Sequence, residues 1–524
     1  MRKLLLPLVW LLAVSSAFAQ QKITFANTVA NIIYNNCTSC HRSGSIAPFT
    51  LQNYQDVVNN QSAIAAAVSS KIMPPWSPDP SYTHMVGEKK LTSEQINQIL
   101  EWVNTGAERG EEAQEPAPPI FNNQSQLLNP QFSSRIHPHT VQHTLDEFAF
   151  FSLPSGLNSD AMLQQIELVP GNRKIVHHIF VFLDSTGQFS NSIIGDSINQ
   201  KGGSSYISGG SLNEIKLIGG WLPGGSYYSV PEGMAFRVPR NSRYIVQIHY
   251  APGSYGLTDS TQLNVKYTSE GIAGNRLMSM RPLLDNSVNL VHQPGPDSNL
   301  FIPANTVKSY KEMQPVGVDL SLISITPHQH LLGKRLKVYA VYNGDTVRLV
   351  DDRWNFHWQG MYTFPKPVHL RAGSVLYAEG TYDNTINNVD NPNYPPKDVV
   401  AGNSTLTEMM QVFFCWVPYQ TGDENIVLGQ IDENTSVQPA MGSVSNCYVY
   451  PNPVVGGNNL NLELLPGALY NLNLYTMDGR LVKDYGQVNV DGHVSIPMPE
   501  LAKGMYFIKI ANSQNVISRK FAVE

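Results

Sequence analysis

The sequence predicts a multidomain chain in which a small all-α domain precedes two all-β sandwiches and a smaller C-terminal β-sandwich. Three observations lead to this fold class. Residues 22–112 contain an amphipathic helix that the capping box Thr92–Gln95 opens and Gly106 ends. From about 146 to 442, short runs rich in Val, Ile, Phe and Tyr are separated by Gly, Pro and Asn turns, and a similar stretch occupies 447–524. A chain of 524 residues has room for about three or four domains.

The N-terminus has the pattern of a secretory signal. Basic residues in Met1–Lys3 precede an apolar run, Leu4–Val14, and the Ala-x-Ala site Ala17–Ala19. We expect residues 1–19 to be removed on export, which brings the mature chain into an oxidising compartment. No later run reaches the roughly 20 apolar residues of a spanning helix. The 35 Lys and Arg residues stand against 41 Asp and Glu and form no basic block, so we expect neither a transmembrane segment nor a nucleic-acid partner.

Residues 37–41 read Cys-Thr-Ser-Cys-His, the pattern of covalent c-type haem attachment. In that pattern Cys37 and Cys40 form thioethers with the haem, and His41 binds the iron. A thioredoxin motif does not call for the histidine, and a structural zinc site needs a second ligand pair nearby, which the sequence lacks. The motif therefore predicts covalent haem c, held by an all-α, cytochrome c-like domain at residues 22–112.

The second axial ligand of this haem has three candidates. Met73 lies in a Pro-stiffened segment, Ile72–Trp76, that resembles the methionine loop of small cytochromes c. The resemblance makes Met73 the leading candidate. Met85 and His84 are the alternatives.

Two cysteines lie outside the haem motif, Cys415 and Cys447. An oxidising compartment permits a disulfide between them. Two unpaired buried thiols are the other interpretation, because spacing along the chain does not tell whether the two Cα atoms come close enough.

An acidic, proline-rich composition predicts an extended linker at residues 113–131, which would make the haem domain separable. Three histidines follow it, His137, His139 and His143, and at first sight resemble a metal site. Pro138 disturbs regular strand geometry between the first two. We expect these three histidines to be surface or adventitious residues without a metal.

Further histidines occur in the long β-rich stretch. His328 and His330 follow a β-rich run, and residues two apart on a strand project to the same face, so the pair can bind one ion. A single histidine is more often a hydrogen-bonded core residue, but His177, His178 and His249 accompany this pair. His177 and His178 would point to opposite faces of a regular strand, so we expect a twist, a bulge or the use of different ring nitrogens there.

Five segments resemble a known family in their order and spacing: Pro170–His178, Gly220–Gly224, Gln247–Tyr250, Pro327–Lys334 and Glu408–Met409. The family is that of the copper type II, ascorbate-dependent monooxygenases, which includes the peptidylglycine α-hydroxylating and dopamine β-monooxygenases. The resemblance covers about 300 residues. It implies two copper-binding sandwiches, which we place at residues 132–284 and 285–442.

The resemblance also implies two copper ions and their ligands. Three residues match the electron-transfer copper of the family: His177, His178 and His249. Three others match the copper that binds dioxygen and performs the chemistry: His328, His330 and Met409. A thioether is a soft ligand that favours Cu(I), the state that meets dioxygen. Gln247, two residues before His249, is a candidate for positioning its ring.

Three positions depart from the peptide-amidating members of the family. Thr326 stands where those members have an arginine that binds the substrate carboxylate, and Gln411 and Phe413 stand where they have Asn and Tyr. A peptidylglycine substrate is therefore disfavoured. The sequence indicates a small molecule or a peptide as substrate but does not identify it. The dense disulfides of the animal members are also missing, which fits a bacterial branch.

Residues 447–524 predict a small β-sandwich of their own. Tyr450–Pro453 opens it, Asp478–Gly479 predicts a two-residue hairpin turn, and apolar residues alternate along Gly504–Ile510. This stretch resembles the C-terminal sorting domain of the bacterial type IX secretion system. The resemblance implies the secretion machinery as a partner and a secreted or cell-surface location in a Gram-negative bacterium, reached through the periplasm.

Together these features predict a secreted copper- and haem-dependent monooxygenase. It would use dioxygen and two electrons, from ascorbate or from the haem domain, to hydroxylate an aliphatic C–H bond of an organic substrate. One alternative is a cell-surface haem and copper electron-transfer or binding protein without hydroxylase activity. Another is a sorted, adhesin-like β protein without copper.

Overall fold

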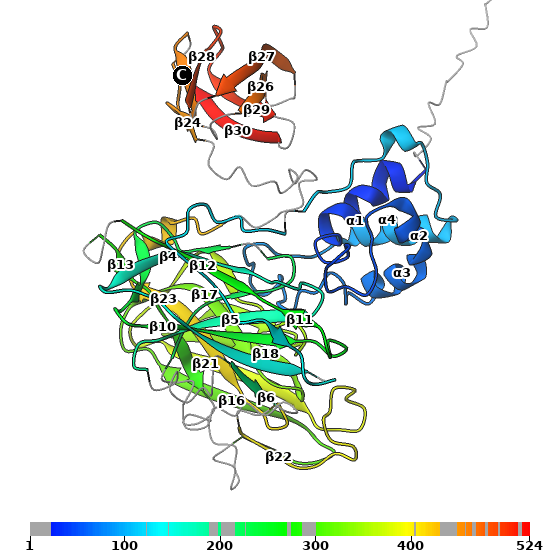
Figure 1. The fold of residues 1–524 in the computed structure, drawn as a ribbon, viewed down its shortest axis with the longest axis vertical. Coiled ribbons are helices and arrows are strands. Elements are labelled where there is room, and N and C mark those ends of the chain that lie inside the picture. The colour runs from blue at the N-terminus through cyan, green and yellow to red at the C-terminus, as the bar shows by residue number, and fades with distance from the viewer. Residues whose placement is uncertain are drawn as a thin grey trace, which may run out of the picture.

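The structure of the chain, a computed structural model, consists mainly of β-strands (Figure 1). Strands account for 44% of the residues and helices for 11%. The structure describes residues 22–429 and 448–524, except for gaps at 122, 145, 188–196, 201–214, 226, 270–273, 286–299, 403–404, 456, 464–467, 477–479, 491–492 and 512–515. The predicted signal at residues 1–19 lies outside the described residues. In the part that is described, no helix has both the length and the apolar character needed to cross a bilayer.

The described N-terminal region contains four α-helices: α1 (Ala30–Asn36), α2 (Tyr54–Asn59), α3 (Gln61–Ser69) and α4 (Ser93–Asn104). The shorter helical turns are η1 (Phe25–Val29) and η2 (Glu112–Gln114). The helices enclose a small apolar core around Phe25 and Trp102. The predicted capping box is confirmed, because Gln95 N–H donates to the Thr92 hydroxyl at 3.0 Å and Thr92 N–H donates to Gln95 Oε1 at 2.9 Å. Helix α4 ends two residues before Gly106, whose φ is 101°.

The predicted fold class is wrong in its all-α, cytochrome c-like domain. The chain is mostly strand, and α4, the longest of the four short helices, has only 12 residues. Residues 70–92, between α3 and α4, form no helix; four prolines there lack the N–H that a helix requires. In this stretch Pro78 instead forms a β-bridge with Asp352 of a sandwich. The N-terminal region therefore shares a sheet edge with the β part of the chain, and no all-α cytochrome c-like domain is evident.

Residues 77–86, which we call the docking segment, fasten the N-terminal region to the second sandwich. Met85 is fully buried in the core of that sandwich. Three backbone hydrogen bonds join the two parts: Asp79 N–H to Asp351 O (2.8 Å), Arg353 N–H to Ser77 O (3.0 Å) and Val86 N–H to Thr363 O (2.8 Å). The region is therefore attached to the second sandwich by burial and by sheet-like hydrogen bonds, and the linker at residues 113–131 stays a prediction.

The first sandwich consists of two large sheets. The six-stranded sheet has the order β1-β12-β4-β9-β13, with β8 paired to β4: β1 (Phe132–Arg135), β12 (Gln262–Tyr267), β4 (Ala161–Val169), β9 (Met234–Val238), β13 (Arg276–Leu277) and β8 (Tyr228–Ser229). The five-stranded sheet has the order β6-β3-β10-β5-β7: β6 (Ser197–Gln200), β3 (Glu147–Pro154), β10 (Arg243–Tyr250), β5 (Val176–Asp184) and β7 (Lys216–Trp221). A short pair joins β2 (His139–Thr140) and β11 (Thr258–Asp259).

The second sandwich also has two main sheets. One has the order β14-β23-β17-β20: β14 (Ser279–Asp285), β23 (Gln411–Pro418), β17 (Leu320–His328) and β20 (Tyr362–Leu370). The other has the order β16-β21-β18-β19: β16 (Val307–Pro315), β21 (Val375–Asp383), β18 (Gly333–Tyr342) and β19 (Asp345–Asp352). Beside them lie β15 (Phe301–Ile302), its partner β22 (Val399–Val400) and the turn η4 (Asp423–Asn425).

The two sandwiches pack against each other through one sheet of each. The apolar core of the first sandwich continues into three side chains of β17 and β23: Ile323, Cys415 and Val417. Cys415 is a free, fully buried thiol. The predicted disulfide finds no support, and its other cysteine, Cys447, lies outside the described residues.

The C-terminal unit contains a three-stranded and a four-stranded sheet. The first is β24 (Tyr448–Tyr450), β25 (Asn459–Glu463) and β28 (His493–Pro497). The second has the order β27 (Leu481–Val490), β26 (Ala468–Thr476), β29 (Gly504–Ala511) and β30 (Val516–Val523). The predicted alternation along β29 is confirmed, because Tyr506, Ile508 and Ile510 are all buried. The predicted turn at Asp478–Gly479 lies outside the described residues.

Candidate metal centres

Three histidines from neighbouring strands converge on one point. His177 and His178 belong to β5, and His249 belongs to the adjacent β10. The Nδ1 atoms of His177 and His178 lie 3.2 Å apart, and those of His178 and His249 lie 3.4 Å apart. Nitrogens that share one ion at about 2 Å lie roughly 3.3 Å from one another. The donor atoms of these three residues therefore fit a single metal ion.

A β-bulge brings the two adjacent histidines to the same side. His178 pairs with His249 across the strands, but the next pair joins Val176 to Tyr250, so His177 is the extra residue. The bulge that the adjacent histidines predicted is thereby confirmed. Local bending of β5 lets both rings reach the point that His249 faces.

The outer nitrogen of His249 is held by a carboxylate. His249 Nε2 donates to Asp146 Oδ1 at 2.6 Å, and the Phe148 ring stacks on the His249 ring at 4.2 Å. This contact leaves Nδ1 as the nitrogen for a metal. The sequence interpretation assigned the positioning role to Gln247, which instead lines a cavity. Nothing in the sequence around Asp146 marked it for this role.

All three rings of this group are neutral at pH 7. Burial, with the charge of neighbouring histidines, lowers the pKa of His177 to about 4. The same causes lower the pKa of His178 and of His249 well below the usual value. A neutral imidazole keeps a lone pair for a metal ion, so the electrostatics agree with the geometry.

A second group lies where β17 ends. The ring centres of His328 and His330 are 5.2 Å apart. Gln359 Oε1 lies 3.1 Å from His328 Nδ1, and His330 Nδ1 donates to the Thr407 carbonyl at 2.8 Å. Both rings are thus held through Nδ1, which leaves Nε2 for a metal. Burial, with His330 nearby, lowers the pKa of His328 to about 3, so this ring is also neutral.

Glu408 joins the two halves of this second group. Its carboxylate accepts the backbone N–H groups of His330 (2.9 Å), Leu332 (2.7 Å) and Met409 (3.2 Å). Burial nevertheless raises the pKa of Glu408 to about 8, against the lowering effect of those donors. The carboxyl group therefore fixes the turn after His328 against the segment that carries Met409. Sequence reasoning used Glu408 only to choose Met409 and missed this contact.

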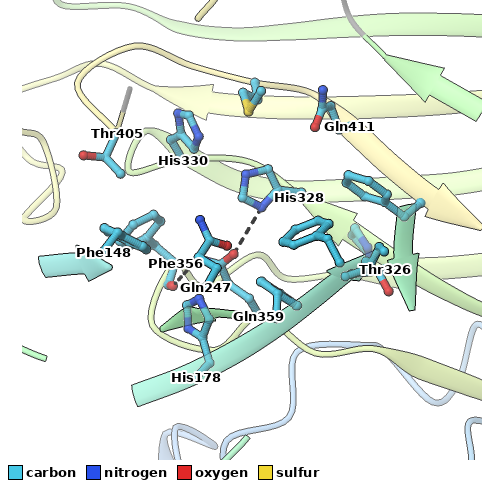
Figure 2. A pocket seen from close by; sticks show the side chains of 16 residues that line it. Phe148, His178, Gln247, Thr326, His328, His330, Phe356, Gln359, Thr405 and Gln411 are labelled. Atoms are coloured by element: carbon cyan, nitrogen blue, oxygen red, sulfur yellow. Dashed lines mark hydrogen bonds between the residues drawn. The ribbon is translucent and has the colours of Figure 1, made fainter. Parts of the chain in front are cut away.

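One cavity connects the two groups. It has a volume of about 100 Å³ and is lined by His178 from the first group and by His328, His330 and Met409 from the second. Figure 2 shows His178 on one wall and His328 and His330 on the other, with Phe148 and Phe356 between them. The structure thus brings His328, His330 and Met409, which we call the His-Met group, to one cavity. His178 of the three-histidine group lines the same cavity.

The haem motif lines a second, apolar cavity of about 300 Å³. Cys37, Cys40, His41 and Met73 all contribute to its wall. The Phe49 carbonyl lies 3.1 Å from His41 Nδ1, which leaves Nε2 for an iron ion. These residues and the apolar lining fit a covalently attached haem.

The structure separates the three candidates for the other axial position. Met73 lines the cavity. Met85 is fully buried in the core of the second sandwich, and the mostly exposed His84 pairs with Glu88 at 3.1 Å. Among the described residues that line the cavity, Met73 is thus the candidate that remains.

The haem-motif cavity also reaches the three-histidine group. His177 lines it, as do Pro223 of the first sandwich and His357 and Trp358 of the second. Cys40 Sγ lies 3.6 Å from the Pro223 carbonyl, and the rings of His177 and His357 are 6.0 Å apart. Three parts of the chain that are distant in sequence therefore form a single wall.

The histidines that follow the predicted linker behave differently from one another. His137 is exposed, as expected. His139 is buried and its Nε2 donates to Glu147 Oε1 at 2.6 Å, so the expectation of a surface residue is wrong for it. Glu147 also accepts the backbone N–H groups of Gln142 (2.7 Å) and His143 (3.0 Å). This group is a buried structural network at the start of β3.

Two stretches of the chain match described protein families. Residues 301–425 match the family "Copper type II ascorbate-dependent monooxygenase, C-terminal domain", and this range contains His328, His330 and Met409. The match supports a copper-dependent, monooxygenase-like oxidoreductase role, with dioxygen and a reductant as partners. Residues 448–524 match "Secretion system C-terminal sorting domain". The protein is thus exported by type IX secretion to the cell surface or beyond, as predicted.

Other similarities are weak. The calpain-like protease palB/RIM13 of Candida albicans is 25% identical over 170 residues, which are 30% of this chain and 24% of that protein, so the chain spans about a quarter of its length. A β-glucuronidase of Ruminococcus gnavus is 11% identical, with 47% of this chain and 44% of the other covered and a TM-score of 0.13. The adhesin domain of Epf from Streptococcus pyogenes is 12% identical, with 42% of this chain and 73% of the other covered, and its TM-score is also 0.13. No argument rests on these similarities. The family matches do not include residues 22–112, so the predicted cytochrome c domain has no support from them.

Proposed function

We propose that this protein is a secreted two-copper monooxygenase with a covalently attached haem, which hydroxylates a C–H bond of an organic substrate. The observation that carries the proposal is the cavity that His178 shares with His328, His330 and Met409. A hydroxylation of this kind inserts one atom of dioxygen into the C–H bond and releases the other as water, with two electrons and two protons consumed. Bound copper ions would supply dioxygen activation and the one-electron transfers.

The protein's own residues orient the reaction. Gln359 and the Thr407 carbonyl hold the rings of His328 and His330 through Nδ1, so that both Nε2 atoms are available for the metal. Met409 adds a thioether that favours Cu(I). Phe148 and Phe356 line the cavity between the two groups and make this part of its wall apolar.

The proposal assigns the haem to the cavity lined by Cys37, Cys40, His41 and Met73. The two cysteines would form the thioethers, and His41 Nε2 and the Met73 sulfur would bind the iron. Because His177 lies in the same wall, a haem held in this cavity would adjoin the three-histidine group. This proximity supports the haem as the electron donor, in place of ascorbate or beside it.

The first test is the metal content of the mature, full-length chain. We expect about two copper ions and one haem per chain after reconstitution and removal of excess metal. With a substrate in hand, isotope-labelled dioxygen should leave one labelled oxygen atom in the product. A chain that retains no copper contradicts the proposal.

A second candidate function is a haem and copper electron carrier at the cell surface, which the shared wall at His177 also favours. Substrate-dependent dioxygen uptake distinguishes the two functions. We expect uptake that Met409→Ala abolishes if the protein is an enzyme. Haem that an external partner reduces, with no oxygen incorporated into any tested compound, would favour the carrier.

A further inference from the structure

The cavity between the two histidine groups has no ionisable side chain other than histidine among the described residues that line it. Five phenylalanines and a leucine form most of its wall: Phe148, Phe180, Phe182, Phe356, Phe413 and Leu217. The remaining polar groups, apart from the histidines, are uncharged amides and hydroxyls. A charged group that enters such a site loses its hydration without gaining a partner of opposite charge.

The apolar side chains reach the cavity because strand register places them there. On the first sandwich, Phe180 pairs with Gln247 and Phe182 pairs with Leu217. On the second sandwich, Thr326 pairs with Phe413, and His328 pairs with Gln411. Thr326 and His328 are two residues apart on β17 and so share a face. Apart from Phe356, which lies in the loop between β19 and β20, these phenylalanines and Leu217 therefore belong to strands of two sheets.

One polar atom in this wall lacks a partner. Thr326 is 3% exposed, and its Oγ1 makes no hydrogen bond in the described part of the chain. A buried hydroxyl without a partner costs about 1–3 kcal/mol, which a ligand that hydrogen-bonds to it can recover. Gln359 is already engaged, because its Oε1 contacts His328 Nδ1 and its Nε2 donates to the Phe356 carbonyl. Thr326 thus offers a ligand a buried hydroxyl that has no partner among the described residues.

From these observations we infer that the cavity binds an uncharged, apolar substrate group, an aromatic ring or a compact aliphatic chain, whose neutral oxygen hydrogen-bonds to Thr326. The inference deepens the proposed function and rests on it for the reaction that follows binding. A volume of about 100 Å³ suits a group of this size. Carboxylate or ammonium groups of the substrate must lie outside the cavity.

Three probes with the same ring test the inference: phenylacetamide (neutral), phenylacetate (anionic) and phenethylamine (cationic). Binding is measured by calorimetry on the full chain, once loaded with copper and once after chelation, because a bound copper ion itself attracts anions. In the chelated chain we expect phenylacetamide to bind at least about 10-fold more tightly than either charged probe. In the copper-loaded chain, phenylacetamide should still bind more tightly than phenethylamine.

Thr326→Val removes the hydroxyl and preserves the shape of the side chain. We expect it to weaken phenylacetamide binding by about 3- to 10-fold and to leave toluene, which has no hydrogen-bonding group, unchanged. Thr346→Val, at an exposed threonine of β19, is the matched control and should change the binding of neither phenylacetamide nor toluene. Charged probes that bind the chelated chain as tightly as phenylacetamide overturn the inference, as does Thr326→Val without effect on phenylacetamide. Absence of binding by all three probes below about 10 mM also overturns it.

Copper measured on the same samples separates the two proposals. If phenylacetamide binds in a Thr326-dependent way but the chain retains no copper, the proposed function fails and the ligand site stands. If two copper ions are retained but the probes show no preference for the neutral compound, the substrate inference fails and the proposed function stands.

Discussion

The two histidine groups differ in which ring nitrogen they offer and in what holds the other. In the three-histidine group the Nδ1 atoms converge, and the carboxyl group of Asp146 holds His249 from outside. In the His-Met group, the neutral groups Gln359 and the Thr407 carbonyl hold the rings through Nδ1 and leave Nε2 free. The three-histidine group adjoins the haem-motif cavity through His177. The His-Met group lines the cavity between the two groups. The difference supports the proposal that one site transfers electrons and the other contacts a substrate.

Removing one ligand from each group should have the largest effect on this contrast. We expect His249→Ala and Met409→Ala each to retain one copper ion per chain where the unchanged protein retains two. Affinity at the altered site should fall by more than about 100-fold, because loss of a ligand exceeds the roughly 10–100-fold effect of losing the hydrogen-bond partner of a ligand. Elemental analysis after dialysis measures the loss.

Oxidation state sharpens the same experiment. Met409→Ala should weaken Cu(I) binding more than Cu(II) binding, because the thioether is soft, whereas His249→Ala should weaken both alike. His493→Ala and Met505→Ala, at exposed positions of the C-terminal unit, serve as controls. If either ligand variant loses both ions, the two groups do not act as independent sites.

Met85 and Met73 should respond differently to substitution, because one lies in a core and the other lines the haem-motif cavity. Met85→Ala should lower the free energy of unfolding by about 2–5 kcal/mol, because it leaves a cavity in the core of the second sandwich. In the haem-free chain Met73→Ala should cost less than about 1 kcal/mol, since Met73 is 38% exposed. In the haem-loaded chain only Met73→Ala should change the absorption spectrum of the haem. A spectral change in Met85→Ala with unaltered stability would reverse the assignment of the axial ligand.

The partners that hold the rings should matter less than the ligands. Asp146→Asn should lower copper affinity of the three-histidine group by about 10–100-fold, because it replaces a charged hydrogen-bond acceptor by a neutral one. Gln359→Leu should lower affinity at the His-Met group by only about 3- to 10-fold, because the lost hydrogen bond is between neutral groups. Competition with a copper chelator measures both. Equal effects of the two changes would contradict the contrast between a charged and a neutral support.

The smallest effect concerns pH at the docking segment, where Pro78 forms a β-bridge with Asp352. Burial and the neighbouring Asp351 carboxylate raise the pKa of Asp352 to about 8. The folded state therefore holds a proton that the unfolded state releases near its ordinary pKa of about 4, so stability falls as pH rises from there to about 8. Between pH 7 and 9 the free energy of unfolding should drop by about 1 kcal/mol.

Asp352→Asn should flatten this decline, because the amide does not ionise. Asp345→Asn, at an exposed position of the same strand, should leave the decline as it is. Thermal unfolding at several pH values measures both. A decline that persists in Asp352→Asn would show that another group is responsible.

The sequence was informative where structure depends on near neighbours. Thr92 and Gln95 predicted the start of α4, because a capping box joins residues three apart. Adjacent His177 and His178 predicted a bulge in β5, because side chains alternate along a strand. The all-α domain was the main error. A haem motif and one capped helix indicated a familiar compact domain, but the proline-rich residues 70–92 became part of a contact with β19 instead.

The sequence by itself determined the types of ligand, their grouping and the signals for export, since these depend on residue identity and short spacing. Only the tertiary structure decided which residues support those ligands: Asp146, Gln359 and Glu408 each act on a partner in another segment. It also decided that Met85 lies in a core and Met73 in a cavity, and that His177 closes the cavity of the haem motif. Such contacts depend on how whole sheets and loops pack together. That packing involves many residues that are distant in sequence, so short sequence patterns do not predict it.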